Sequence, residues 1–129
     1  MSNPWTVTNR ASAGSAASAT QAAPSGGATA NSCVRLIALQ CKLSGSAAGT
    51  DLLVVRDGPT GTGTIIWQQD LSVPANGSDS IDESGMDLRA TPGNGLTIEF
   101  VSGVISDRET VNAQGDIVPI GYPAFQAPY

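Results

Sequence analysis

The stretch that decides the fold is CVRLIALQCKL, residues 33–43. Its side chains follow a period of two, and one of the two alternating sets turns polar towards the end of the stretch, at Gln40 and Lys42. This pattern predicts a half-buried β-strand rather than a helix. One face is expected to carry Cys33, Arg35, Ile37, Leu39, Cys41 and Leu43, and the other face Val34, Leu36, Ala38, Gln40 and Lys42.

Further strand patterns follow, and turn sequences rich in Gly, Pro and Asn separate them. Strands are predicted at 50–57, 64–73, 80–82, 96–101 and, more weakly, in two pieces of 104–122 that are split at 113–115. The turn DGPTGTG predicts a hairpin of the first two, with Ile65 and Trp67 facing inward. No segment has a convincing helical period. The prediction is an all-β chain: an antiparallel β-sandwich or jelly-roll-like body with an extended N-terminal arm.

Three parts are expected along the chain: an arm at 1–31, the sandwich at 32–122 and a Pro- and aromatic-rich tail at 123–129. Residues 11–31 are small or polar and carry no charge, and no Leu, Ile or Phe occurs before residue 31. We therefore expect the arm to be flexible, or to become ordered only on a partner. Its removal is expected to leave a folded body.

Composition argues against several functional classes. Only 13% of the 129 residues are charged, with 11 acidic and 6 basic residues and a net charge of −5. Six scattered basic residues do not make the positive face that binds nucleic acid. Histidine is absent, which excludes Ser–His–Asp and Cys–His catalysis and histidine metal ligands. We expect a structural or binding protein without enzymatic activity, cofactor or metal.

The residues available for a core are few. Leu, Ile, Val and Phe account for 27 of 129 residues, just above the level at which chains tend to be disordered. Lys42 is the single lysine that could protect a sheet edge by charge. Both features predict that the domain benefits from association with other subunits.

Targeting and membrane segments are not indicated. The N-terminus MSNPWTVTNR lacks an apolar run, and no stretch approaches the roughly 18 apolar residues of a membrane helix. We expect synthesis in the cytoplasm and no contact with a membrane.

Aromatic residues near both ends of the chain are candidate partner anchors. A Trp on a flexible arm is costly to leave in water and well suited to an interface. The aromatic residues of the tail lie on a Pro-rich backbone that either packs back on the sandwich or reaches a neighbour. The candidate partner-binding residues are Pro4, Trp5, Val7, Tyr122, Phe125 and Tyr129.

The two cysteines, Cys33 and Cys41, are predicted to share one strand face. A straight strand would hold them roughly 26 Å apart, whereas a disulfide needs Cα atoms within about 7 Å. We expect two buried, unpaired thiols, because a metal site would need further Cys or His ligands.

Two other motifs indicate ligand binding only weakly. The segment GPTGTGT at 58–64 is superficially like a phosphate loop, but the Lys is missing and the segment joins two strands, so a hairpin loop is expected. Asp79, Asp82, Glu83 and Asp87 form an acidic cluster. Solvated charges are expected there, with a weak calcium site or an acid–base pair as alternatives.

An ordered series of strand and turn motifs runs across residues 28–122. The motifs are ANSCVR at 30–35, VRDG at 55–58, IIW at 65–67, VPANG at 73–77, LTIEF at 96–100 and GY at 121–122. In this order the body resembles small β-sandwich virion proteins of tailed bacteriophages, the capsid decoration or cement proteins. These motifs concern strands and turns, so no functional residue is carried over.

The resemblance implies a homotrimeric decoration protein on the capsid surface of the virion. It would bind the major capsid protein and stabilise contacts between coat subunits, without a cofactor. Two other functions stay open. One is a module of a phage tail, baseplate or fibre that adheres to host-surface glycan, and the other is a small glycosidase that uses carboxylates.

Overall fold

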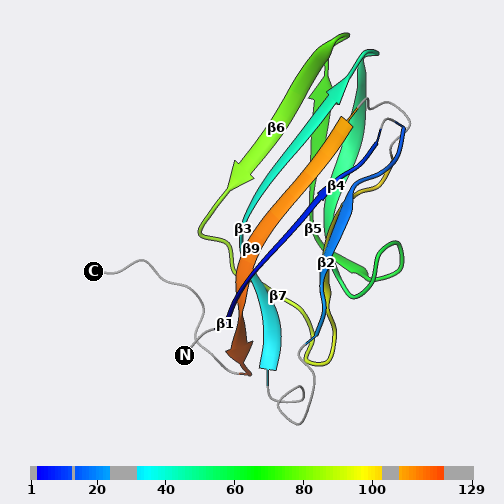
Figure 1. The fold of residues 1–129 in the computed structure, drawn as a ribbon. Coiled ribbons are helices and arrows are strands. Elements are labelled where there is room, and N and C mark those ends of the chain that lie inside the picture. Colours follow the sequence, from blue (N-terminus) through cyan, green and yellow to red (C-terminus); the bar gives the residue numbers. More distant parts are fainter. Residues whose placement is uncertain (1–2, 13, 24–31, 103–107, 121–129) are drawn as a thin grey trace.

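The computed structural model describes residues 3–12, 14–23, 32–102 and 108–120. These residues form nine β-strands in two antiparallel sheets that face each other as a sandwich (Figure 1). Among them, no helix is long and apolar enough to span a membrane. The predicted all-β antiparallel sandwich is confirmed.

Sheet A has the strand order β1-β9-β3-β6, and the short strand β7 also pairs with β3. Its strands are β1 (Asn3–Arg10), β3 (Ser32–Gly45), β6 (Gly77–Glu83), β7 (Leu88–Arg89) and β9 (Arg108–Pro119). Sheet B has the order β2-β8-β4-β5. Its strands are β2 (Ser18–Gln21), β4 (Gly49–Asp57), β5 (Thr64–Val73) and β8 (Leu96–Phe100).

The strand pairs are nested within one another. β1 pairs with β9, β2 with β8, β3 with β6 and β4 with β5, all antiparallel. The chain therefore resembles one long hairpin that is rolled into two layers, and the pairs β3–β9 and β4–β8 complete the two sheets. This connectivity is the jelly roll, with β7 as an addition to its eight strands.

Apolar side chains from both sheets fill the space between them. The largest expose at most 1% of their surface: Leu36, Leu39, Leu43, Leu53, Leu71, Leu96, Ile98 and Phe100. Trp67 is half-buried and packs against this core. Ile65, predicted to face inward, is 42% exposed beyond a shift in the β4–β5 register. The described apolar residues are largely covered within one chain, with Val101 and Ile120 as further exposed exceptions.

A bulge in β3 changes the predicted faces of this strand. The register with β9 shifts between Leu36 and Ala38, so Ile37 is an extra residue in β3. One extra residue reverses the inside–outside alternation beyond it. The core face therefore carries Val34 and Leu36 before the bulge and Leu39, Cys41 and Leu43 after it.

The N-terminal residues differ from the predicted flexible arm. β1 pairs with β9, and β2 pairs with β8, so each adds an edge strand to one sheet (Figure 1). The prediction is wrong for these residues, and removal of residues 1–30 would take one strand from each sheet. Composition was misleading because a small side chain has a weak hydrophobic signal but can be fully buried, as Ala17 is at 0% exposure.

β9 is also longer than predicted. It is one continuous strand of 12 residues, not two pieces split at 113–115. Both neighbours, β1 and β3, pair with it through this segment, so backbone hydrogen bonds outweigh the weak strand propensity there. Gly115 is required at this point. A Cβ atom there would overlap the carbonyl oxygen of Arg35 and lie 2.5 Å from the ring of Trp5.

Candidate interaction surface

Among the predicted N-terminal anchors, Trp5 belongs to the fold. Only 9% of its surface is exposed, and its ring lies against Gly115 of β9. Its indole Nε1 donates a hydrogen bond of 3.0 Å to the backbone carbonyl of Asp116. Val7 is half-buried against the same core, whereas Pro4 is exposed. Trp5 therefore packs β1 against the sandwich, and its side chain is buried rather than exposed to a partner.

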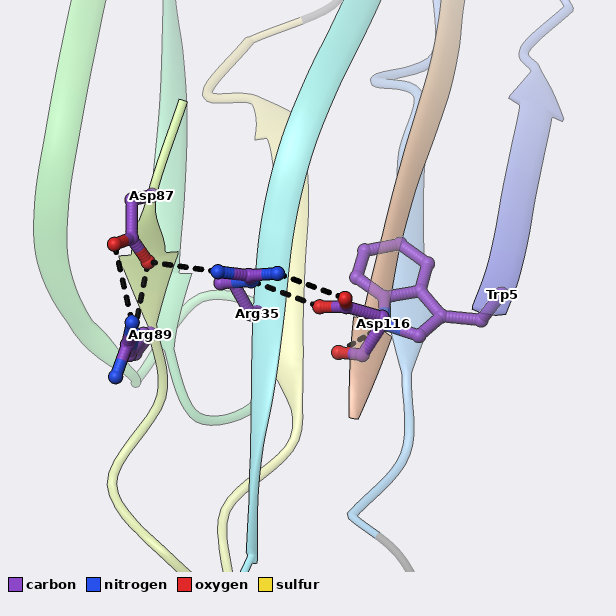
Figure 2. A network of polar contacts seen from close by, with 5 residues as sticks. All are labelled: Trp5, Arg35, Asp87, Arg89 and Asp116. Atoms are coloured by element: carbon purple, nitrogen blue, oxygen red, sulfur yellow. Dashed lines mark hydrogen bonds and ion pairs between the residues drawn. The ribbon is translucent and has the colours of Figure 1, made fainter. Parts of the chain in front are cut away.

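A row of charged side chains continues from Trp5 across sheet A (Figure 2). Arg35 binds the carboxylate of Asp116 in a bidentate manner, and both N···O distances are 2.8 Å. On its other side, Arg35 Nη1 lies 3.9 Å from Asp87 Oδ1. Asp87 accepts hydrogen bonds of 2.8 and 3.1 Å from Arg89. The sign of the charge alternates along the row, so each ion has an opposite neighbour.

This charged row has a structural role. It joins β9, β3 and β7, and it reaches β1 through the indole of Trp5 (Figure 2). Arg35 and Asp116 expose only 6% and 5% of their surface, and charges so buried need their partners. The sequence signal for this row was one Arg within the apolar stretch 33–39. Its partner, 81 residues further along the chain, had no comparable signal.

The predicted anchors of the tail, Tyr122, Phe125 and Tyr129, lie outside the described residues. Ile120, which ends the described part of the chain, exposes 53% of its surface. The partner-binding role of the tail stays a prediction.

Three of the four acidic residues singled out in the sequence have separate partners. Asp79 accepts hydrogen bonds from the backbone N–H groups of Ser72 and Ser80, at 3.0 and 2.9 Å. Asp82 faces Gln40, and Asp87 belongs to the charged row. Within the described ranges, no group of three or more Cys, Asp or Glu residues is placed to hold a metal ion.

The Gly/Thr-rich loop between β4 and β5 is held by the protein's own groups. Glu99 on β8 forms an ion pair with Arg56 and accepts a hydrogen bond of 3.0 Å from the N–H of Gly61. Arg56 also donates to the carbonyl of Gly63 at 3.0 Å. A backbone N–H that a phosphate loop would direct at its ligand is thus used by Glu99. The geometry agrees with the predicted hairpin loop.

Both cysteines are free thiols and both are buried, as predicted. The bulge places them on opposite faces of β3, which corrects the prediction of a shared face. Cys41 lies in the core, where burial raises the pKa of its thiol to about 12. Burial also raises the pKa of Cys33, although Arg89 and Arg35 oppose this effect. Neither thiol is activated as a nucleophile.

No protein-family model matches this sequence, and no curated protein matches it. Similar folds do occur among solved structures. A protein of naturally occurring empty Cowpea mosaic virus particles has a TM-score of 0.51 at 12% identity, covering 100% of this chain and 93% of that chain. The Tobacco streak virus coat protein has a TM-score of 0.40 at 14% identity, over 98% and 92% of the two chains. An arabinose-bound α-L-arabinofuranosidase has a TM-score of 0.42 at 11% identity, over 85% and 19%.

One of these comparisons supports the fold class, that with the protein of the Cowpea mosaic virus particle. The first match has a TM-score above 0.5 over nearly the whole of both chains, and at 12% identity it shows a shared fold alone. The chain is a jelly-roll protein, and its fold also occurs in a protein of a virus particle.

Proposed function

We propose that this chain is a structural protein of a virus particle. In finer terms, we propose a decoration (cement) protein that binds the outer shell of a tailed-bacteriophage head and stabilises contacts between major capsid proteins. The observation that supports the proposal is the jelly roll itself, which overlaps 93% of the length of a protein from a virus particle.

The side-chain chemistry fits a role without catalysis. Buried charged groups hold strands together, as Arg35 does with Asp116, or hold a loop, as Glu99 does with Arg56. Such ion pairs between distant segments suit a protein that must resist mechanical stress on a shell. The absence of histidine from the sequence points the same way.

A second candidate function is a coat protein that forms the shell itself. The same overlap favours it, because the virus-particle protein and this chain match over nearly the full length of both. The two candidates differ in one property. A coat protein assembles from copies of itself, whereas a decoration protein needs a shell that is already formed.

Co-sedimentation with preformed heads tests the proposal. Size exclusion with light scattering first gives the mass of the full-length chain, for which a homotrimer predicts 39 kDa, three times 13.0 kDa. The protein is then mixed with heads of the encoding phage that lack it, and the heads are pelleted. Saturable binding supports a decoration protein, and closed particles of the chain alone support a coat protein. If the protein neither binds the heads nor assembles by itself, both candidate functions are contradicted.

The tail residues give a variant for the same assay. Replacing Tyr122, Phe125 and Tyr129 by Ala is expected to weaken head binding by about tenfold or more, because aromatic anchors carry much of the binding energy. The matched control is Thr50→Ala, an exposed position on sheet B. Equal binding by the triple variant and the control would remove the tail from the interface.

A further inference from the structure

The outer face of sheet A has a patch of polar side chains around an open hollow of about 350 Å³. Three neighbouring strands, β9, β3 and β6, contribute to it (Figure 1). The register of these strands places the contributing residues in two rows. The first row is Asn112, Gln40 and Asp82, and the second row is Thr110, Lys42 and Ser80. These six residues form the polar grid.

Two amide groups of the polar grid have fixed orientations. Gln114 is the next residue after Asn112 on the outer face of β9, and it lies outside the hollow. Its Nε2 donates hydrogen bonds to Gln40 Oε1 at 2.9 Å and to Asn112 Oδ1 at 2.8 Å. Both carbonyl oxygens therefore face Gln114, and both NH₂ groups face away from it. Gln40 Nε2 lies 3.4 Å from Asp82 Oδ1, at the far side of the row. Donors that are oriented before a ligand binds lose less entropy on binding.

The chemistry of the polar grid indicates a ligand rich in hydroxyl groups. The hollow is lined by these six polar residues and by Cys41 and Ile81, whose side chains pack in the core. Protein–protein interfaces, in contrast, are centred on aromatic, Met and Arg residues. Lys42 and Asp82 balance each other in charge, and the net charge of −5 disfavours a polyanion. Amide and hydroxyl groups both donate and accept hydrogen bonds, as the hydroxyls of a sugar do.

We propose that the polar grid binds a neutral oligosaccharide, with Gln40 and Asn112 hydrogen-bonded to its hydroxyl groups and Gln114 as a positioning residue. This function goes beyond shell binding and is compatible with it. It also uses residues other than the candidate partner anchors near the two ends of the chain.

A glycan array probed with the full-length protein tests this site, and the strongest neutral glycan is then titrated by calorimetry. Asn112→Ala and Gln40→Ala are each expected to weaken binding by about tenfold, because each removes a donor and an acceptor. Gln114→Glu keeps the side-chain shape but removes the donor that orients both amides, so about fivefold weaker binding is expected. Urea unfolding of these variants should match that of Thr50→Ala, the control on sheet B.

Three results would overturn the proposal. The first is no binding to any neutral glycan of the array. The second is binding that Asn112→Ala and Gln40→Ala leave unchanged in folded protein. The third is binding confined to sialylated glycans and lost in Lys42→Ala, which would mean charge recognition. Head binding is measured separately, so a failure of this site is distinguishable from a failure of the structural function.

Discussion

The burial of Trp5 leads to a quantitative prediction about the N-terminus. Trp5→Ala removes a side chain that is only 9% exposed, together with its hydrogen bond to the Asp116 carbonyl. A buried Trp covers about 150–250 Å², which corresponds to about 4–6 kcal/mol at about 25 cal/mol per Å². Partial relaxation around the cavity brings such losses to about 3–5 kcal/mol. We expect the free energy of unfolding to fall by this amount, a large share of a small domain's stability.

Urea denaturation monitored by circular dichroism measures the loss. Trp5→Phe keeps most of the apolar volume but removes the indole donor, so a smaller loss of about 1–2 kcal/mol is expected. The matched control is Thr6→Ala, an exposed position on the same strand, with an expected change within about 0.5 kcal/mol. Trp67 is the one tryptophan left in Trp5→Ala, so its fluorescence gives a second probe of the same transition.

Equal stability of the two variants would contradict a structural role of β1. If Trp5→Ala and Thr6→Ala unfold at the same urea concentration, β1 contributes little to the sandwich and the N-terminus behaves as the free arm that composition suggested. Gly115→Ala examines the same contact from β9, because the added methyl meets the ring of Trp5 and the carbonyl of Arg35. We expect a loss of about 1–3 kcal/mol or more.

The charged row, the residues around Asp57 and the thiols give three further predictions. Asp116→Asn takes away the bidentate partner of Arg35 and should cost about 3 kcal/mol in urea denaturation, and a loss below about 1 kcal/mol would mean that the pair is effectively solvent-exposed. Burial alone would raise the pKa of Asp57, but hydrogen bonds from Thr91 and Asn94 outweigh it and lower the pKa from its ordinary 3.8. The lower pKa belongs to the folded state, so this stabilisation is present above pH 3.8 and is lost as the pH falls below that value. Asp57→Asn should therefore lessen the loss of unfolding free energy at acid pH. If the variant and the unmodified protein lose stability equally at acid pH, these hydrogen bonds are not the cause. Cys41, with a thiol pKa of about 12, should react with Ellman's reagent at about pH 8 only after urea unfolds the chain, and fast reaction of both thiols in the native protein would contradict their burial.

The strands could be predicted wherever the alternation of side chains was clear. β5 has the predicted bounds, and β4 and β8 differ from their predicted ranges by one residue. Alternation is a property of one strand at a time, so it survives without knowledge of the partners. It failed at Ile37, because a bulge depends on the register with β9, which lies far away in the sequence.

The candidate sites were harder to predict than the strands. Arg35 within an apolar stretch was a visible signal, but Asp116 could be recognised as its partner only after β9 and β3 were paired. Gln40 and Lys42 were expected on the polar side of their strand. Their convergence with Asn112 and Asp82 depends on the lateral order of three strands, which no local pattern specifies.

The sequence by itself determined that the chain is all-β and contains a hairpin at β4 and β5. It also showed that the chain has no histidine and only six basic residues. Side-chain period, turn residues and charge are local or additive properties, so they can be judged without the fold. Only the tertiary structure decided that β1 and β2 complete the two sheets, and that Trp5 lies inside the fold. Burial is a relation between distant segments: the ring of Trp5 is covered because Gly115 leaves room for it.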